Sequence, residues 1–168
     1  MAVREILRLP DPALKHVAVE ATAEEWALVE RVAADLVDTM HDFPRCVGLA
    51  APQIGESVRV IVVDVSLHPK GDPNAVEIVL VNPRVVSGTG SEVAREGCLS
   101  VPEFTADVRR YKEVVVEGLT REGEPWTIET GGFEARALQH EIDHLDGLLF
   151  LDRVDSLARD VFRRKSYG

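Results

Sequence analysis

The sequence predicts a single α+β domain in which antiparallel or mixed strands pack around one central helix. The chain of 168 residues is long enough for one domain with a substantial core. Most of its β-branched segments are grouped between an early helical pattern and a late one, an order typical of α+β folds. We see no internal repeat, linker or low-complexity segment, so residues 1–168 are interpreted as one domain.

The composition excludes several classes of protein. With 45% hydrophobic and 29% charged residues, the chain resembles an ordinary globular protein, and no apolar run approaches the ~18 residues of a membrane span. A formal net charge of −10 argues against general nucleic-acid binding. The first residues lack the features of a secretory signal or an organelle transit peptide, which predicts a cytoplasmic protein. The two cysteines are expected to be free thiols.

The N-terminal third is expected to hold an arm and one amphipathic helix. Residues 6–19 contain Pro10-Asp11-Pro12, which favours an extended arm lying on the body of the domain. Thr22 and Glu25 have the spacing of a helix capping box. The residues that follow at helical spacing are Trp26, Val29, Ala33, Leu36, Val37 and Met40, and His41 and Pro44 mark the end of the helix.

The middle of the chain is expected to form strands. A small, glycine-bearing segment, 46–55, could bring its backbone close to a ligand, although a close-packed strand and turn is equally consistent with it. The predicted strands are 58–65, 77–81 and one beginning at 83–86, with a surface loop at 67–75. A hairpin is predicted from 109–119 and 126–129.

Residues 148–151, which follow the central helix, are interpreted as a short strand. Ser156 is expected to cap a last helix running from Leu157 towards Lys165. The cluster Arg163-Arg164-Lys165 is interpreted as the solvated basic end of that helix.

The central helix carries the most informative pattern, Gln139-His140-Glu141-Ile142-Asp143-His144. His140 and His144 are four residues apart, so they project from one face of a helix and can bind one metal ion. Glu141, the second residue of this HExxH pattern, lies beside them and can transfer protons. A helix with two surface histidines is the alternative. The apolar neighbours Ala135, Ala137, Leu138, Ile142 and Leu145 and the terminating glycine Gly147 argue against it.

Two histidines need a third ligand to form a catalytic site. The position at which one protease class has a third histidine is Phe150, and no glutamate follows Glu141. Four downstream aspartates remain open: Asp146, Asp152, Asp155 and Asp160. We favour an upstream ligand, and Cys98 is the residue to test.

Three stretches, residues 48–53, 96–100 and 139–144, resemble in order and spacing the three signature motifs of the peptide deformylases. The resemblance implies that Cys98 is the third metal ligand, with His140 and His144. It implies that Glu141 is the general base, and that the Gln53 side chain and the Leu99 backbone N–H stabilise the oxyanion. It places the backbone of the substrate along Val47, Gly48 and Gly97.

The implied reaction is hydrolysis of the N-terminal formyl group of formyl-methionine on newly made polypeptides, with release of formate. The implied cofactor is one divalent ion, Fe²⁺ in the native enzyme, with Zn²⁺, Ni²⁺ or Co²⁺ able to occupy the site. The partner is the N-formylmethionyl nascent chain, and the basic tail is a candidate for docking near the ribosomal exit tunnel. Cys46 stands where many members have a glycine. Residues 46–49 and 135–136 resemble the branch that includes mitochondrial deformylases.

Two rival hypotheses compete with this one. A zinc protease or other amidase would share the helix motif, but its downstream third ligand is missing. A non-enzymatic protein with a structural zinc, or with a redox pair of Cys46 and Cys98, would leave Glu141 and Gln53 without a role, and a structural zinc usually has a fourth protein ligand.

Overall fold

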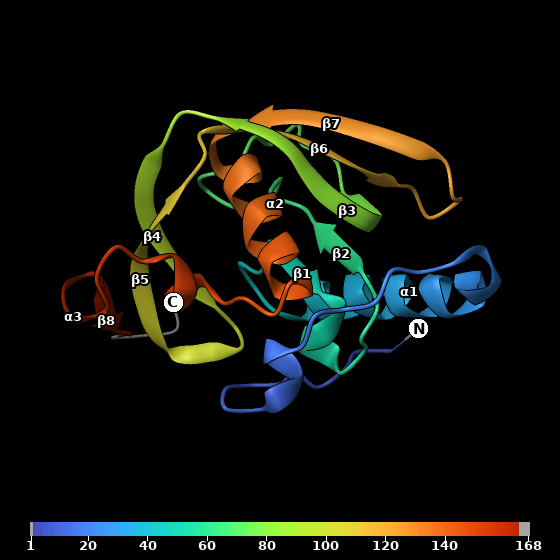
Figure 1. Cartoon of the computed structure of the whole chain (residues 1–168), viewed down its shortest axis with the longest axis horizontal. Helices are drawn as coiled ribbons and strands as arrows, with labels where there is room; N and C mark the ends of the chain where they lie inside the picture. Colours follow the sequence, from blue (N-terminus) through green and yellow to red (C-terminus); the bar gives the residue numbers. More distant parts are fainter. Residues whose placement is uncertain (1, 165–168) are drawn as a thin grey trace.

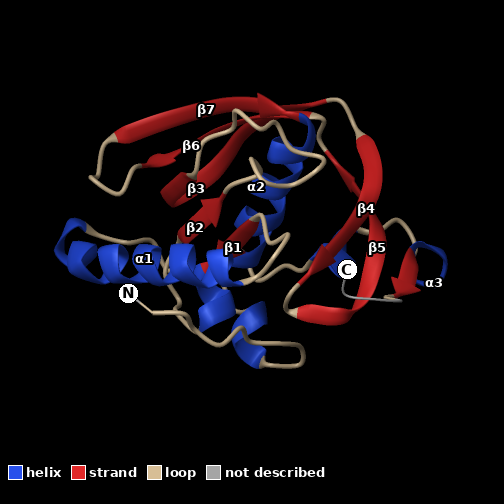
Figure 2. Cartoon of the chain, turned by 180° about the vertical axis from the view of Figure 1, so that it is seen from behind, coloured by secondary structure: helices blue, strands red, loops and turns tan. Residues whose placement is uncertain are grey.

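The computed structural model describes residues 2–164, which form two antiparallel sheets and two long helices (Figures 1 and 2). The helices are α1 (Trp26–Asp42), α2 (Gly132–Leu145) and the short α3 (Leu157–Asp160). The strands are β1 (Gly48–Ala50), β2 (Val60–Val63), β3 (Ile78–Thr89), β4 (Glu92–Cys98), β5 (Val101–Arg110), β6 (Glu113–Leu119), β7 (Pro125–Gly131) and β8 (Val161–Arg163). Short 3-10 helices are η1 (Pro12–Lys15), η2 (Ala23–Glu25), η3 (Ala51–Ile54) and η4 (Phe150–Arg153).

The two sheets lie on different sides of α2, the orange helix at the centre of Figure 1. The larger sheet has the order β1-β2-β3-β6-β7, and the smaller one has the order β4-β5-β8. All strand pairs in both sheets are antiparallel. The predicted α+β class, with strands packed around a central helix, is confirmed.

The core is built on both faces of β2 and β3. Val60 and Val62 pack in the cluster that contains α1, whereas Ile61 and Val63 pack in the cluster that contains α2. Because successive strand residues point to opposite faces, a strand covered on both sides is apolar throughout, as β2 is. Fully burying each such side chain contributes about 1.5–3 kcal/mol. Helix α2 is therefore held against the most buried part of the sheet.

The N-terminal arm joins segments that lie far apart in the sequence. The Leu7 N–H donates to the Gln53 carbonyl over 2.8 Å, and the Leu9 N–H donates to the Ser100 carbonyl over 2.9 Å. The predicted arm is thus confirmed, although residues 12–15 form the turn η1. The predicted first helix is confirmed too, and Glu25 Oε1 accepts from the Thr22 N–H at its start.

Two predicted strands, 77–81 and 83–86, are one continuous strand, β3. Pro83 suggested a break because proline cannot donate a backbone hydrogen bond. It falls where the register between β3 and β6 shifts, between Val81 and Arg84, and its neighbour Asn82 adopts a left-handed φ of 51°. Proline is tolerated at such an irregularity. The predicted strand 58–65 is shorter, Val60–Val63.

The hairpin of β4 and β5 was not predicted. Its outer face is polar, and its inner face includes charged residues such as Glu96 and Arg110, so the usual alternation is hidden. Arg109, expected to begin the next hairpin, belongs to β5 instead. The hairpin of β6 and β7 is confirmed, starting at Glu113.

Two predictions near the C-terminus are wrong. Residues 150–153 form the 3-10 turn η4, where a strand was expected. The last helix begins as predicted, with the Ser156 hydroxyl accepting from the Arg159 N–H, but it ends at Asp160. The chain then pairs with β5 as β8, so Arg163 and Arg164 are not the end of a helix. Lys165 lies outside the described residues. Within residues 2–164, no helix has the length and apolarity needed to cross a membrane.

Candidate metal centre

Helix α2 is buried along nearly its whole length, so its polar residues face other parts of the protein. Its C-terminal end is followed by the predicted terminating glycine, Gly147, which has a φ of 74°. A Cβ at this position would lie 2.6 Å from the Lys15 carbonyl oxygen, so both the backbone angle and the close approach of the arm require glycine.

The side chains of Cys98, His140 and His144 meet at the buried face of α2. Their ligand atoms all lie within 4.8 Å of one another, and Cys98 Sγ is 3.4 Å from His144 Nε2. Ligand atoms of a tetrahedral metal are separated by about 3.5 Å, so the set fits one ion with little movement. A thiolate with two imidazoles is a donor set that suits a transition metal.

The four downstream aspartates do not belong to this group. Each has a cationic partner elsewhere among the described residues. Asp146 pairs with Arg59, Asp152 with Lys15, Asp155 with Arg109, and Asp160 with Arg159. The question left open by the sequence is therefore answered by position: Cys98 is the third potential ligand beside the two histidines.

A buried carboxylate orients His140. Glu96 Oε1 lies 2.9 Å from His140 Nδ1, which leaves Nε2 of that ring for the metal site. Arg110 donates to both oxygens of Glu96, over 2.7 and 3.0 Å, and Arg136 donates over 2.6 Å. Burial alone would raise the pKa of Glu96, but the hydrogen bonds from His140 and Arg110 outweigh it and hold that pKa well below its usual range. Glu96 is therefore an anion that keeps the histidine ring in place.

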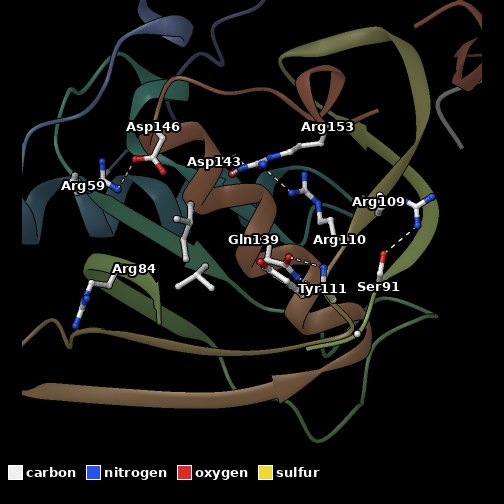
Figure 3. Close-up of a pocket in the computed structure, with 13 residues that line it drawn as sticks. Arg59, Arg84, Ser91, Arg109, Arg110, Tyr111, Gln139, Asp143, Asp146 and Arg153 are labelled. Carbon is white, nitrogen blue, oxygen red and sulfur yellow. Dashed lines mark hydrogen bonds and ion pairs between the residues drawn. The ribbon is translucent and has the colours of Figure 1, made fainter. Parts of the chain in front are cut away.

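The neighbouring stripe of α2, which carries Gln139 and Asp143, is anchored in a similar way (Figure 3). Asp143 accepts from Arg110 over 2.9 Å and from Arg153 in a bidentate pair, at 3.0 Å for each bond. Gln139 bonds both backbone groups of Tyr111, each over 3.0 Å. The helix is thus fixed to β5 and η4 by residues next to the two histidines, and Arg110 connects Asp143 with Glu96. Glu96 and these arginines were not identified as site residues from the sequence. The only signal in the sequence was the position of Glu96, two residues before Cys98.

Replacing Glu96 with glutamine should destabilise the protein by about 3–5 kcal/mol, because buried Arg136 loses its carboxylate partner and buried Arg110 keeps only Asp143. Metal affinity should also fall about 10–100-fold as His140 loses its orienting partner. Since the pKa of Glu96 is lowered from 4.5, its stabilisation is present above that pH and is lost as the pH falls towards the lower folded-state pKa. Urea unfolding at pH 7 and at pH 4 measures the loss of stability and its pH dependence, and a metal titration measures the loss of affinity.

The matched control is Glu92→Gln, on the same strand but with an exposed side chain, which should change stability by less than about 0.5 kcal/mol. Equal stability of the Glu96→Gln and Glu92→Gln proteins at pH 7 would contradict this account.

Glu141 points into the same buried space but pairs with no cation there. Its Oε1 is buried without a hydrogen-bond partner among residues 2–164. Burial raises the pKa of Glu141 to about 7, against the opposing effect of the positive charges of His140 and Arg110. A Cβ at Gly48 would lie 2.8 Å from Glu141 Oε2, so the missing side chain of Gly48 makes room for this carboxylate. The Glu141 carboxyl thus has a pKa close to neutrality.

Gln53 is buried in η3, which packs against α2. Its Oε1 accepts from the Ala50 N–H over 3.0 Å, which directs the NH₂ group towards the metal ligands. The Nε2 atom is 3.5 Å from Cys98 Sγ and 3.0 Å from Ser100 Oγ. Leu99, half-buried, follows Cys98 in the turn that joins β4 to β5. The structure thus brings the predicted residue Gln53, in η3, to Cys98 at the end of β4, which Leu99 follows.

The three predicted substrate-binding residues lie in or beside edge strands of the two sheets. Gly48 is in β1, an edge strand of the larger sheet, with Val47 just before it. Gly97 is in β4, an edge strand of the smaller sheet, and is exposed. Cys46 is a free thiol that donates to the Gly48 carbonyl over 3.3 Å, and burial raises its pKa to about 12. The high pKa argues against a redox role for Cys46.

A cysteine, two histidines one helical turn apart and an adjacent buried glutamate define a metal-dependent hydrolase. Known proteins agree with this class. The sequence model of the polypeptide deformylase family matches residues 3–160. Peptide deformylase 2 of Vibrio vulnificus (strain CMCP6) is 47% identical over 165 residues, which cover 98% of this chain and 94% of that protein.

Solved structures agree as well. The crystal structure of a peptide deformylase from Legionella pneumophila has a TM-score of 0.80 and 43% identity, over 94% of this chain and 89% of that one. A Met-Ala-Ser-bound class I type b peptide deformylase from Acinetobacter baumannii has a TM-score of 0.82 and 34% identity, over 91% of this chain and 99% of that one. The chain belongs to the peptide deformylase family, metal-dependent enzymes that remove the N-terminal formyl group from newly made polypeptides.

Proposed function

We propose that Cys98, His140 and His144 hold one divalent ion, Fe²⁺ in the native enzyme, with Zn²⁺, Ni²⁺ or Co²⁺ as substitutes. The clustering of one thiol and two imidazoles within 4.8 Å is the observation that carries this proposal. When bound, the ion supplies Lewis-acid chemistry: it lowers the pKa of a water and polarises the formyl carbonyl. The hydrogen bond from His140 to Glu96 supports its role as a neutral ligand through Nε2.

Glu141 is the general base and then the general acid. It takes a proton from the attacking water and delivers it to the amine that leaves when the formyl C–N bond breaks. Its burial and its pKa of about 7 support this use, because a group that must both accept and return a proton works best near the ambient pH. The products are formate and a peptide with a free α-amine.

The Gln53 side-chain amide and the Leu99 backbone N–H stabilise the negative charge that develops on the formyl oxygen. The orientation of Gln53 supports this role. The bond from Ala50 to its Oε1 keeps the NH₂ group on the side of Cys98, and the bond to Ser100 holds it there. Such donors act without reorganising during the reaction.

Gln53→Ala should lower kcat for formate release by about 10²–10³-fold, because one oxyanion donor is lost, while the metal stays bound. Steady-state kinetics together with metal analysis test this. Ser100→Ala is the matched control, since it removes only the hydroxyl that accepts from Gln53 Nε2 and should lower kcat much less. Full activity of Gln53→Ala with its metal in place would remove Gln53 from the oxyanion site.

The substrate peptide lies as an added strand, and it pairs with the backbone of Val47 and Gly48 on one side and of Gly97 on the other. Both β1 and β4 are edge strands, so their outer backbone groups are available for such pairing. The Acinetobacter baumannii relative, whose crystal structure is Met-Ala-Ser bound, supports the binding of a peptide. Backbone pairing tolerates many sequences, which suits an enzyme that acts on most new chains.

We further propose that residues 1–168 form one catalytic domain that works in the cytoplasm on chains emerging from the ribosome. The family match over residues 3–160 supports one domain. The decisive experiment is formate release from formyl-Met-Ala-Ser by anaerobically purified protein with its metal quantified. Rapid release with about one ion per chain would establish the reaction and its metal. Absence of formate after reconstitution with iron, nickel or cobalt would overturn the proposal.

A further inference from the structure

Two carboxylates face each other where β2 ends and β3 begins. Val63 of β2 is paired with Ile78 of β3. In this antiparallel register the next residues outward, Asp64 and Glu77, stand directly opposite each other. Like charges in opposite positions destabilise a strand pair, and among residues 2–164 neither carboxylate forms an ion pair with a lysine or an arginine. This end of the strand pair therefore holds two negative charges that call for another cation.

The end of α1 brings an imidazole to the same place. Val62 and Val79 pack in the core cluster that contains α1. Because side chains alternate along a strand, Asp64 and Glu77, each two residues further along, project on the same side of the sheet. His41 is in the last turn of α1, and its Nε2 lies 3.2 Å from Glu77 Oε2. The three side chains thus come from three elements, and their donor atoms all lie within 4.8 Å of one another.

The three donors form a set that suits a divalent transition metal. Zinc is commonly bound by three protein ligands from imidazole and carboxylate groups, with water in the remaining position. Asp64 Oδ1 accepts from the Ser66 N–H over 3.0 Å and from the Ser66 hydroxyl over 2.7 Å, which holds the carboxylate in place. The partial negative charge at the C-terminal end of α1 adds attraction for a cation. An ion bound here would replace the repulsion between Asp64 and Glu77 by attraction of both to the metal, which a neutral His41 cannot do.

We propose that His41, Asp64 and Glu77 form a second metal site, which binds a divalent transition-metal ion such as Zn²⁺. The inference goes beyond the proposed function and does not depend on it, because none of the three residues belongs to the metal centre on α2. The ion joins the end of α1 to β2 and β3, beside the Asp64 N–H that donates to the Val47 carbonyl over 2.8 Å. It therefore braces the segment that leads into β1. Because His41 and Glu77 are exposed and no thiolate takes part, this site binds more weakly than the buried centre and fills only when metal is added.

Calorimetric titration of Zn²⁺ into protein that already holds one zinc ion per chain tests the inference. The wild type should take up a second equivalent, and the added Zn²⁺ should raise its melting temperature, because an ion that binds the folded state stabilises it. His41→Lys keeps a positive charge beside Glu77 but removes the imidazole, so it separates metal binding from a simple ion pair. It should lose the rise in melting temperature and weaken binding of the second ion by more than the about 10–100-fold that follows from losing a ligand's outer partner.

His16→Ala is the matched control, since it removes an exposed histidine outside both groups of ligands, and it should keep the second equivalent. Both variants should retain the first zinc ion, which shows that the fold and the buried centre are intact. Uptake of a single equivalent by the wild type would overturn the inference. A second equivalent that His41→Lys binds as tightly as the wild type would also overturn it, because the imidazole would then not be a ligand.

Discussion

Replacing Glu141 with alanine is expected to reduce kcat for formate release by about 10²–10⁴-fold while the protein keeps its metal. The carboxylate is buried, one oxygen has no protein partner among residues 2–164, and it is not one of the three clustered ligands. Its removal therefore takes away the proton acceptor and leaves the thiol and both imidazoles in position. Kinetics with formyl-Met-Ala-Ser, combined with metal analysis of the same sample, measure the two quantities separately.

Glu134→Ala is the matched control for this experiment. Glu134 is in the first turn of the same helix, where it accepts from the Thr130 hydroxyl over 2.8 Å, away from the metal ligands. It should keep wild-type turnover. If Glu141→Ala loses its metal, the role of Glu141 is structural; if it turns over normally, another group is the base.

Replacing Cys98 with alanine is expected to abolish stoichiometric metal binding. Two imidazoles without the thiolate leave an incomplete set of ligands, and the loss in affinity should exceed the about 10–100-fold that follows from losing a ligand's outer partner. Metal per chain after dialysis, measured against the wild type, gives the result directly. Activity should fall in parallel.

Cys46→Ala controls for the loss of a thiol, because Cys46 is the second cysteine and stands outside the ligand cluster. It should retain about one ion per chain. Cys98→Ser preserves the volume of the side chain, which separates loss of the ligand from a packing defect in the cluster that Cys98 shares with Val101 and Phe150. Tight metal binding by both Cys98 variants would exclude Cys98 as a ligand.

The ligand helix could be predicted because its information is local. Two histidines four residues apart and a terminating glycine lie within one stretch of sequence, and the structure places each as expected. Cys98 could be reached only through the unfilled ligand position and the resemblance. Cys98 and His144 are 46 residues apart in the chain, because β5, β6 and β7 lie between them.

The supporting shell could not be predicted because its partners are distant in sequence and mixed in character. Glu96 meets Arg110, Arg136 and His140 inside the protein, a place where charged residues are rare. The same charges hid the alternation of apolar and polar residues by which the hairpin of β4 and β5 would have been predicted. The strand β8 was missed for another reason: a helix cap at Ser156 was correct, but pairing with β5 overrode the helical tendency after Asp160.

The N-terminal arm has a mechanical consequence for the enzyme. Leu7 and Leu9 are hydrogen-bonded to Gln53 and Ser100, so residues 7–9 connect η3 with the turn between β4 and β5. The length of such a short peptide is limited by covalent geometry. Residues 7–9 therefore restrict how far these two segments can move apart, and they contribute to the geometry of the metal centre although none of them belongs to it.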